Sequence, residues 1–130
     1  MVSIFTRIIQ GEIPCHKIAE SEHFLAFLDV SPLREGHTLV VPKHEVDYIF
    51  DIEDDKLGEM MIFAKSVAKK VQAAIPCVRI GVAVIGLEVP HAHIHLIPMD
   101  TVKDINFTQK KMTPSQEELA ATAAKICDRL

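Results

Sequence analysis

The sequence is poor in features that mark secreted or membrane-spanning proteins. Its three cysteines, Cys15, Cys77 and Cys127, are odd in number and far apart, with no Cys-x-x-Cys pair. This pattern favours reduced thiols over a disulfide framework. The longest apolar run, residues 80–87, contains two glycines and is far shorter than the ~20 residues of a membrane span. We therefore expect no contact with a bilayer.

Positive charge is also scarce, because 14 Lys and Arg residues stand against 18 Asp and Glu residues and give a net charge of −4. This deficit argues against a protein that binds the nucleic-acid backbone or an anionic membrane. Any phosphate ligand must then meet local donors. Residues 1–7 lack a basic segment leading into an apolar block, so no secretory signal is expected and a cytoplasmic location is predicted.

The length and composition predict one folded domain over residues 1–130. The chain is 48% hydrophobic and 25% charged, which excludes disordered and fibrous classes. A chain of this size buries roughly two thirds of its unfolded surface, so it can hold a core without disulfides or structural metal.

Hydrophobic periodicity predicts an α+β order of elements. Ser3 is expected to cap a short helix over residues 4–10, which Gly11 ends. Short β-prone runs at residues 17–19 and 24–28 predict an antiparallel hairpin, and residues 37–41 predict a third strand before Pro42.

The second half of the chain predicts two further strands between two helices. Apolar residues recur at three and four over residues 54–75, which predicts a long helix that Pro76 ends. Residues 78–85 and 91–97 predict the fourth and fifth strands. Thr113 as cap, Pro114 and Gln116 predict a last helix reaching about Arg129, so that residues 99–130 form a C-terminal extension.

Three histidines, His91, His93 and His95, alternate with apolar residues in the fifth predicted strand. A strand sends alternate side chains to opposite faces, so all three imidazoles should share one face. Alternate positions lie roughly 6.7 Å apart, which lets neighbouring rings reach one tetrahedral phosphoryl group. The spacing thus indicates a phosphate-handling site.

Imidazole chemistry explains why such a cluster would be useful. Crowded cations repel, so at least one ring should stay neutral near pH 7. His93, flanked on both sides, is the expected nucleophile, and its attack on an α-phosphorus would give a covalent phosphoramidate. His91, His95 and backbone amides would hold the phosphoryl oxygens.

Two other interpretations of the cluster remain open from spacing alone. The histidines could be packing residues, although each unpaired buried ring nitrogen would cost ~1 to 3 kcal/mol. They could also bind zinc in a three-histidine site and make the protein a zinc-dependent hydrolase.

The segment from His91 to Ile97 matches the pattern His-φ-His-φ-His-φ-φ, with φ hydrophobic, at all seven positions. It therefore resembles the signature of the histidine triad (HIT) family. Residues 4–14, 25–32 and 36–43 are similar to the corresponding segments of the Hint branch, so the resemblance covers roughly residues 3–98.

This resemblance implies roles for particular residues. The middle histidine, His93, would become nucleotidylated, His91 and His95 would assist at the phosphate and leaving group, and His37 would support the triad from the neighbouring strand. Asp29 would take the ribose hydroxyls. The apolar walls around the base would be formed by Ile4, Phe5, Ile8, Phe27, Leu28, Val30 and Leu39, although Leu39 also suits simple packing.

The resemblance also implies a fold and a function. The fold would be HIT-like, an antiparallel sheet of about five strands with one long helix, a short N-terminal helix and a C-terminal helix, in a symmetric homodimer. The function would be hydrolysis of purine nucleoside phosphoramidates without a cofactor. The alternatives are hydrolysis of dinucleoside polyphosphates and nucleotide binding with little catalysis.

One departure from the family concerns metal. Many bacterial relatives have a Cys-x-x-Cys that joins two histidines in a structural zinc site, whereas here Ser3, Thr6 and Glu45 stand at matching positions. We therefore predict no structural zinc, which also weakens the case for a metal at the triad.

Overall fold

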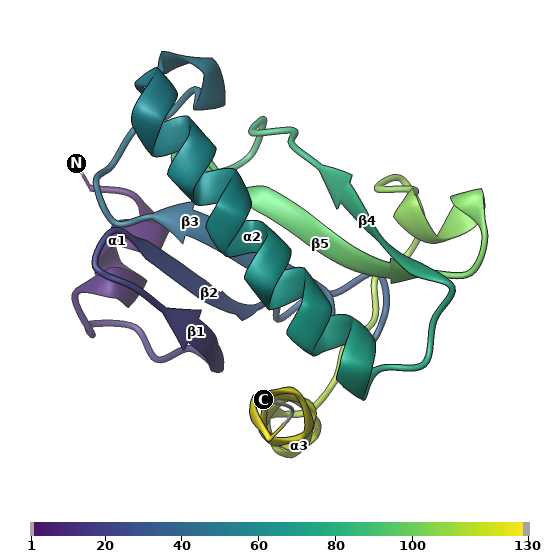
Figure 1. Cartoon of the computed structure of the whole chain (residues 1–130). Coiled ribbons are helices and arrows are strands. Elements are labelled where there is room, and N and C mark those ends of the chain that lie inside the picture. Colours follow the sequence, from purple (N-terminus) through teal and green to yellow (C-terminus); the bar gives the residue numbers. More distant parts are fainter. Residues whose placement is uncertain (1, 129–130) are drawn as a thin grey trace.

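Antiparallel strands and three α-helices make up the computed structural model, which describes residues 2–128. Its α+β fold confirms the predicted fold class, with a five-stranded sheet as expected. No helix in this part of the chain combines the length and the apolar character that crossing a membrane would need. The elements in chain order (Figure 1) are α1 (Ile4–Ile9), β1 (Lys17–Glu20), β2 (Phe24–Leu28), β3 (Thr38–Pro42), α2 (Asp54–Ala74), β4 (Arg79–Ala83), β5 (Ile94–Met99) and α3 (Gln116–Cys127), with 3-10 helices at Ile49–Asp51 and Val102–Ile105.

The strands lie in the order β1-β2-β3-β5-β4, and each neighbouring pair is antiparallel. Phe27 pairs with Leu39, and Leu39 pairs with His95. Directly opposed residues project to the same face of a sheet. This register therefore places two apolar side chains and one imidazole in a row across three strands.

The two faces of the sheet are covered differently. The long helix α2 crosses one face (Figure 1), where alternate residues of β2, namely Phe24, Ala26 and Leu28, join the main core. The intervening residues Leu25 and Phe27 belong to a second cluster that includes Phe5 of α1. Alternation along β2 thus builds a core on one face and the wall of a site on the other.

The same alternation holds at the histidine segment. Ala92, Ile94 and Leu96 lie in the main core below α2, whereas the His93 ring packs against Phe5 on the opposite face. The regular strand nevertheless begins at Ile94, so the prediction of a strand from residue 91 was wrong. The reason is local, because the backbone N–H of His91 bonds to the carbonyl of Val89 in a turn.

The helix ends follow their capping chemistry. The Ser3 side chain accepts a hydrogen bond from the Thr6 N–H and caps α1 as predicted. The predicted cap of the last helix at Thr113 was wrong, because α3 begins after Ser115, where Ser115 and Glu118 form a reciprocal capping box. The predicted end of this helix, Arg129, lies outside the described residues.

Candidate active site

A cavity of about 420 Å³ opens on the α1 side of the sheet. The structure brings to its wall every residue predicted to bind the nucleoside, and it adds a loop, residues 85–89, on one rim. Of the four predicted catalytic histidines, His93 and His95 line the cavity, whereas His37 and His91 lie behind it. The predicted nucleoside-binding residues at the wall are Ile4, Phe5, Ile8, Phe27, Leu28, Asp29, Val30 and Leu39. Leu28 borders the cavity, but its side chain packs in the main core on the α2 face.

His93 is held in one tautomer by the backbone. Its Nδ1 lies 2.7 Å from the carbonyl oxygen of His91, and because a carbonyl oxygen only accepts, Nδ1 carries the proton. No buried side-chain nitrogen among the described residues lacks a partner, so the unbonded Nε2 must be open to the cavity. In the neutral ring this Nε2 presents a lone pair, as a nucleophile requires.

His95 is oriented the opposite way by a relay of hydrogen bonds. The Leu33 N–H donates to His37 Nδ1 at 3.0 Å, so in the neutral His37 ring the proton sits on Nε2. His37 Nε2 in turn lies 3.0 Å from His95 Nδ1 and donates to it. His95 therefore carries its own proton on Nε2, which offers the cavity an N–H donor beside the lone pair of His93.

Burial keeps this relay neutral. Desolvation, reinforced by the neighbouring His95, lowers the pKa of His37 to about 3. Desolvation and the neighbouring His93 lower the pKa of His95 to about 4. Both rings are therefore uncharged at pH 7, so the tautomers set by the Leu33 N–H persist at physiological pH.

These lowered pKa values predict acid sensitivity of the fold. A histidine in the unfolded chain becomes protonated near pH 6.5. Between pH 6.5 and 4 the unfolded chain therefore binds protons that His37 and His95 do not bind in the folded protein. The free energy of unfolding should fall as the pH falls, by up to about 1.4 kcal/mol per pH unit for each histidine. Urea unfolding at pH 7.5, 6 and 5 measures the slope.

His37→Asn serves as the control for that slope. Removing one buried imidazole should make the decline between pH 6 and 5 shallower, because one proton fewer distinguishes the two states. A decline as steep as in the unchanged protein would contradict the assignment to His37.

His91 corrects the expectation that three rings face the phosphate. It is fully buried, and its Nε2 donates to the carbonyl of Pro42 at 2.8 Å. Its Nδ1 lies 2.7 Å from the Ser3 hydroxyl, which donates to it. With both nitrogens occupied, His91 acts on the site through its carbonyl, which orients His93.

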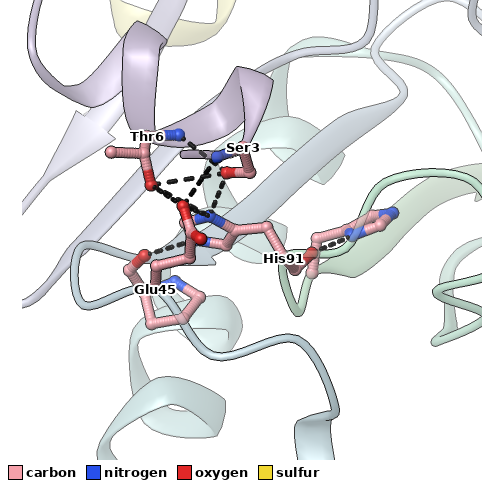
Figure 2. Close-up of polar contacts among 6 residues, drawn as sticks. Ser3, Thr6, Glu45 and His91 are labelled. Atoms are coloured by element: carbon pink, nitrogen blue, oxygen red, sulfur yellow. Dashed lines mark hydrogen bonds and ion pairs between the residues drawn. The ribbon is translucent and has the colours of Figure 1, made fainter. Parts of the chain in front are cut away.

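Figure 2 shows the polar cluster that holds His91. One carboxylate oxygen of Glu45 accepts from the Ser3 backbone N–H at 2.7 Å and from the Thr6 hydroxyl at 2.5 Å. These bonds lower the pKa of Glu45, the bond from the Ser3 N–H most strongly. The cluster ties α1 to the histidine segment through groups 85 or more residues apart in sequence.

The donor set of this cluster does not match a structural zinc site. Such sites are built from cysteine thiolates and imidazoles, whereas Ser3 and Thr6 supply neutral hydroxyls that already satisfy Glu45 and His91. Elsewhere, Asp29, His37 and His95 each offer one atom within 4.8 Å of the others and are a candidate metal-binding group. His37 Nε2 and His95 Nδ1 already form a hydrogen bond with each other.

Ser3→Ala tests the cluster. The variant loses the cap of α1 and leaves the buried Nδ1 of His91 without its 2.7 Å donor, so we expect the free energy of unfolding to fall by about 1 to 3 kcal/mol. Chemical unfolding measures the loss. Ser66→Ala, which removes an exposed hydroxyl on α2, is the matched control and should change stability by less than about 0.5 kcal/mol.

Asp29 stands at the end of β2, where its carboxylate reaches the cavity. The Ser31 N–H donates to it at 2.9 Å, and its other oxygen lies 3.7 Å from His37 Nε2. Burial raises the pKa of this carboxyl. A half-buried acceptor pair of this kind suits the two hydroxyls of a ribose.

Two residues of the C-terminal extension complete the cavity and were missed by sequence reasoning. Phe107 packs edge-on against His95, with ring centres 4.8 Å apart, and Lys111 lines the cavity. Neither residue lies in a strand or a helix, and neither belongs to a motif in the sequence. No signal in the sequence could have placed them at the site.

The chain is similar to known proteins both in sequence and in structure. A model of the HIT domain matches residues 10–102. An uncharacterised HIT-like protein of Methanocaldococcus jannaschii is 42% identical over 102 residues, which span 73% of this chain and 77% of that protein. Adenosine 5'-monophosphoramidase HNT1 of Saccharomyces cerevisiae is 38% identical over 96 residues, 73% of this chain and 61% of that enzyme.

The fold is likewise similar to solved structures. A HIT-like protein of Bartonella henselae, described as involved in cell-cycle regulation, superposes with a TM-score of 0.84 at 30% identity. The alignment covers 98% of this chain and 96% of that one. The likeness therefore extends over the C-terminal extension as well as the sheet.

Proposed function

The chain belongs to the HIT family, and from this premise we propose that it hydrolyses purine nucleoside phosphoramidates through a covalent intermediate on His93. One observation carries the proposal: the cavity presents the Nε2 lone pair of His93 beside the N–H of His95. Two relatives are named as adenosine 5'-monophosphoramidases, at 38% and 35% identity.

The proposed reaction has two steps. In the first, His93 Nε2 attacks the α-phosphorus, the P–N bond breaks, and the amine nitrogen leaves with the bonding pair and takes a proton from water. The N–H of His95 stabilises the negative charge on a phosphoryl oxygen. In the second, the hydroxide left from that water attacks phosphorus, and His93 departs with the lone pair it began with.

Binding of the nucleoside follows from the walls of the cavity. The apolar side chains of Ile4, Phe5 and Ile8 form one wall, suited to a flat base, and Asp29 accepts from the ribose hydroxyls. This arrangement would place the α-phosphorus over His93, whose ring centre lies 5.0 Å from that of Phe5.

Mass spectrometry of protein quenched during turnover tests the proposal. With an adenosine phosphoramidate as substrate, we expect one nucleotide adduct on the peptide that contains His93. A diadenosine polyphosphate is the comparison substrate, and faster turnover of it would favour the alternative hydrolase. Nucleotide binding with neither turnover nor adduct would indicate a binding protein.

The surface supports a homodimer as part of this proposal. β4 is an edge strand, and its Val82 is 52% exposed, while Ile62 on α2 is 70% exposed. An apolar edge strand beside an apolar helix face is a surface that a second copy would cover. Sedimentation should give a mass twice the 14.5 kDa of the single chain. The Val82→Lys variant should sediment with the mass of one chain.

A cytoplasmic location stays a prediction.

A further inference from the structure

The C-terminal extension contributes the cation of the cavity. Among the described residues that line it, Lys111 alone is a lysine or arginine, and the carboxylates are Asp29 and Glu88. Lys111 is half-buried, and within residues 2–128 no carboxylate oxygen lies within 4.0 Å of its ammonium. A half-buried cation in the wall of a cavity, with no carboxylate partner beside it, attracts a ligand of opposite charge, so this position favours an anionic ligand.

The segment around Lys111 is held in place. The N–H of Met112 donates to the carbonyl of Pro32 at 2.9 Å, and the Phe107 ring packs against both His37 and His95. The backbone on either side of Lys111 is therefore attached to the wall of the site. Its charge contributes to lowering the pKa of His37 and of His95 and opposes the burial that raises the pKa of Asp29, so the ammonium faces the part of the cavity where these three groups meet.

Aromatic and imidazole rings give the order of parts across the cavity. The ring centres of Phe5 and His93 are 5.0 Å apart, those of His93 and His95 are 4.9 Å apart, and those of His95 and Phe107 are 4.8 Å apart. The base lies at the Phe5 end and the α-phosphorus at His93. The part of the substrate beyond the phosphorus, the leaving group, then lies toward Phe107 and Lys111.

We propose that Lys111 is a specificity-determining residue that pairs with an anion on the leaving group. The preferred substrates are then nucleoside phosphoramidates whose amine carries a carboxylate or phosphate, rather than those of uncharged amines. This inference rests on the proposed phosphoramidase function and names the substrate class of the same site.

The charges of the cavity explain why Lys111 decides this preference. Asp29 and Glu88 give the wall two negative charges against one positive charge, while His37 and His95 are neutral at pH 7. A leaving group with its own negative charge would be repelled unless a cation meets it directly. An uncharged leaving group is not repelled by these carboxylates, so Lys111 should add little to its binding.

Two matched substrates separate this role from contact with the α-phosphate. The adenosine 5'-phosphoramidates of glycine and of glycinamide differ by one carboxylate. We expect the unchanged protein to prefer the glycine compound in kcat/KM. Lys111→Gln should lower kcat/KM for the glycine compound by about 10- to 100-fold, the effect of one lost charge-assisted hydrogen bond, and by less than about 3-fold for the glycinamide compound.

Lys110→Gln is the matched control, because Lys110 is an exposed neighbour that does not line the cavity. It should leave the preference intact, and Lys111→Arg should retain most of it. Salt should weaken the preference of the unchanged protein through screening.

The outcomes divide cleanly. An equal loss on both substrates in Lys111→Gln would assign Lys111 to the α-phosphate and overturn the inference, as would no loss on either. An equal effect of Lys110→Gln would reduce the preference to general surface charge and overturn it too. If the unchanged protein hydrolyses neither compound, the proposed function itself fails, and the inference fails with it.

Discussion

Replacing His93 by alanine is expected to abolish hydrolysis of an adenosine phosphoramidate, with kcat falling by at least about 1,000-fold. The variant keeps the base wall and Asp29 but loses the Nε2 lone pair that would attack phosphorus. Because the imidazole contributes mainly in the transition state, the affinity for AMP should change by less than about 5-fold. Steady-state kinetics and calorimetric titration with AMP measure the two quantities.

The matched control is His23→Ala, since His23 is exposed and lies outside the cavity. Its kcat should equal that of the unchanged protein. Turnover by His93→Ala within 10-fold of the unchanged protein would refute His93 as the nucleophile. Loss of AMP affinity together with turnover would instead assign the ring to ground-state binding.

Leu96→Ala is expected to show the opposite behaviour, a large loss of stability with chemistry preserved. Leu96 is 1% exposed and lies in the core below α2, on the face opposite its neighbour His95. Truncation leaves a cavity at the centre of the sheet, so the free energy of unfolding should fall by about 2 to 5 kcal/mol. Urea unfolding monitored by circular dichroism measures it.

The folded fraction of Leu96→Ala should retain kcat within about 3-fold, because the side chain faces away from the site. Val78→Ala, which truncates a 65% exposed side chain, is the control and should cost less than about 0.5 kcal/mol. A loss below about 1 kcal/mol in Leu96→Ala would contradict the placement of Leu96 in the core.

Most of the fold could be predicted from local patterns in the sequence. The alternation of histidine with apolar residues from 91 to 96 predicted one face for the core and one for the site, and the packing of Ile94 and Leu96 below α2 confirms it. The cap at Ser3 could also be predicted, because its hydrogen bond from the Thr6 N–H joins residues only three positions apart. The cap of α3 was misplaced because Thr113 and Ser115 are both good capping residues with a capping-box partner three residues on, Gln116 and Glu118, and the folded chain uses Ser115 with Glu118.

The site could be predicted only in part from the sequence. The sequence by itself indicated most of the residue types that meet at the cavity, namely imidazoles, Asp29 and an apolar wall, because strand alternation and a family pattern are local signals. The tertiary structure decided what each imidazole does. In the folded chain His91 is buried behind the cavity, hydrogen bonds set the tautomers of His93 and His95, and Lys111 lines the cavity.

Backbone groups explain that division. The atoms that set the tautomers are the Leu33 N–H and the carbonyls of Pro42 and His91. Every residue type has a backbone carbonyl, and every type except proline has a backbone N–H. Their identity therefore leaves no trace in the amino-acid sequence. Their partners are chosen when strands distant along the chain come together, which is where the chemistry of each ring is decided.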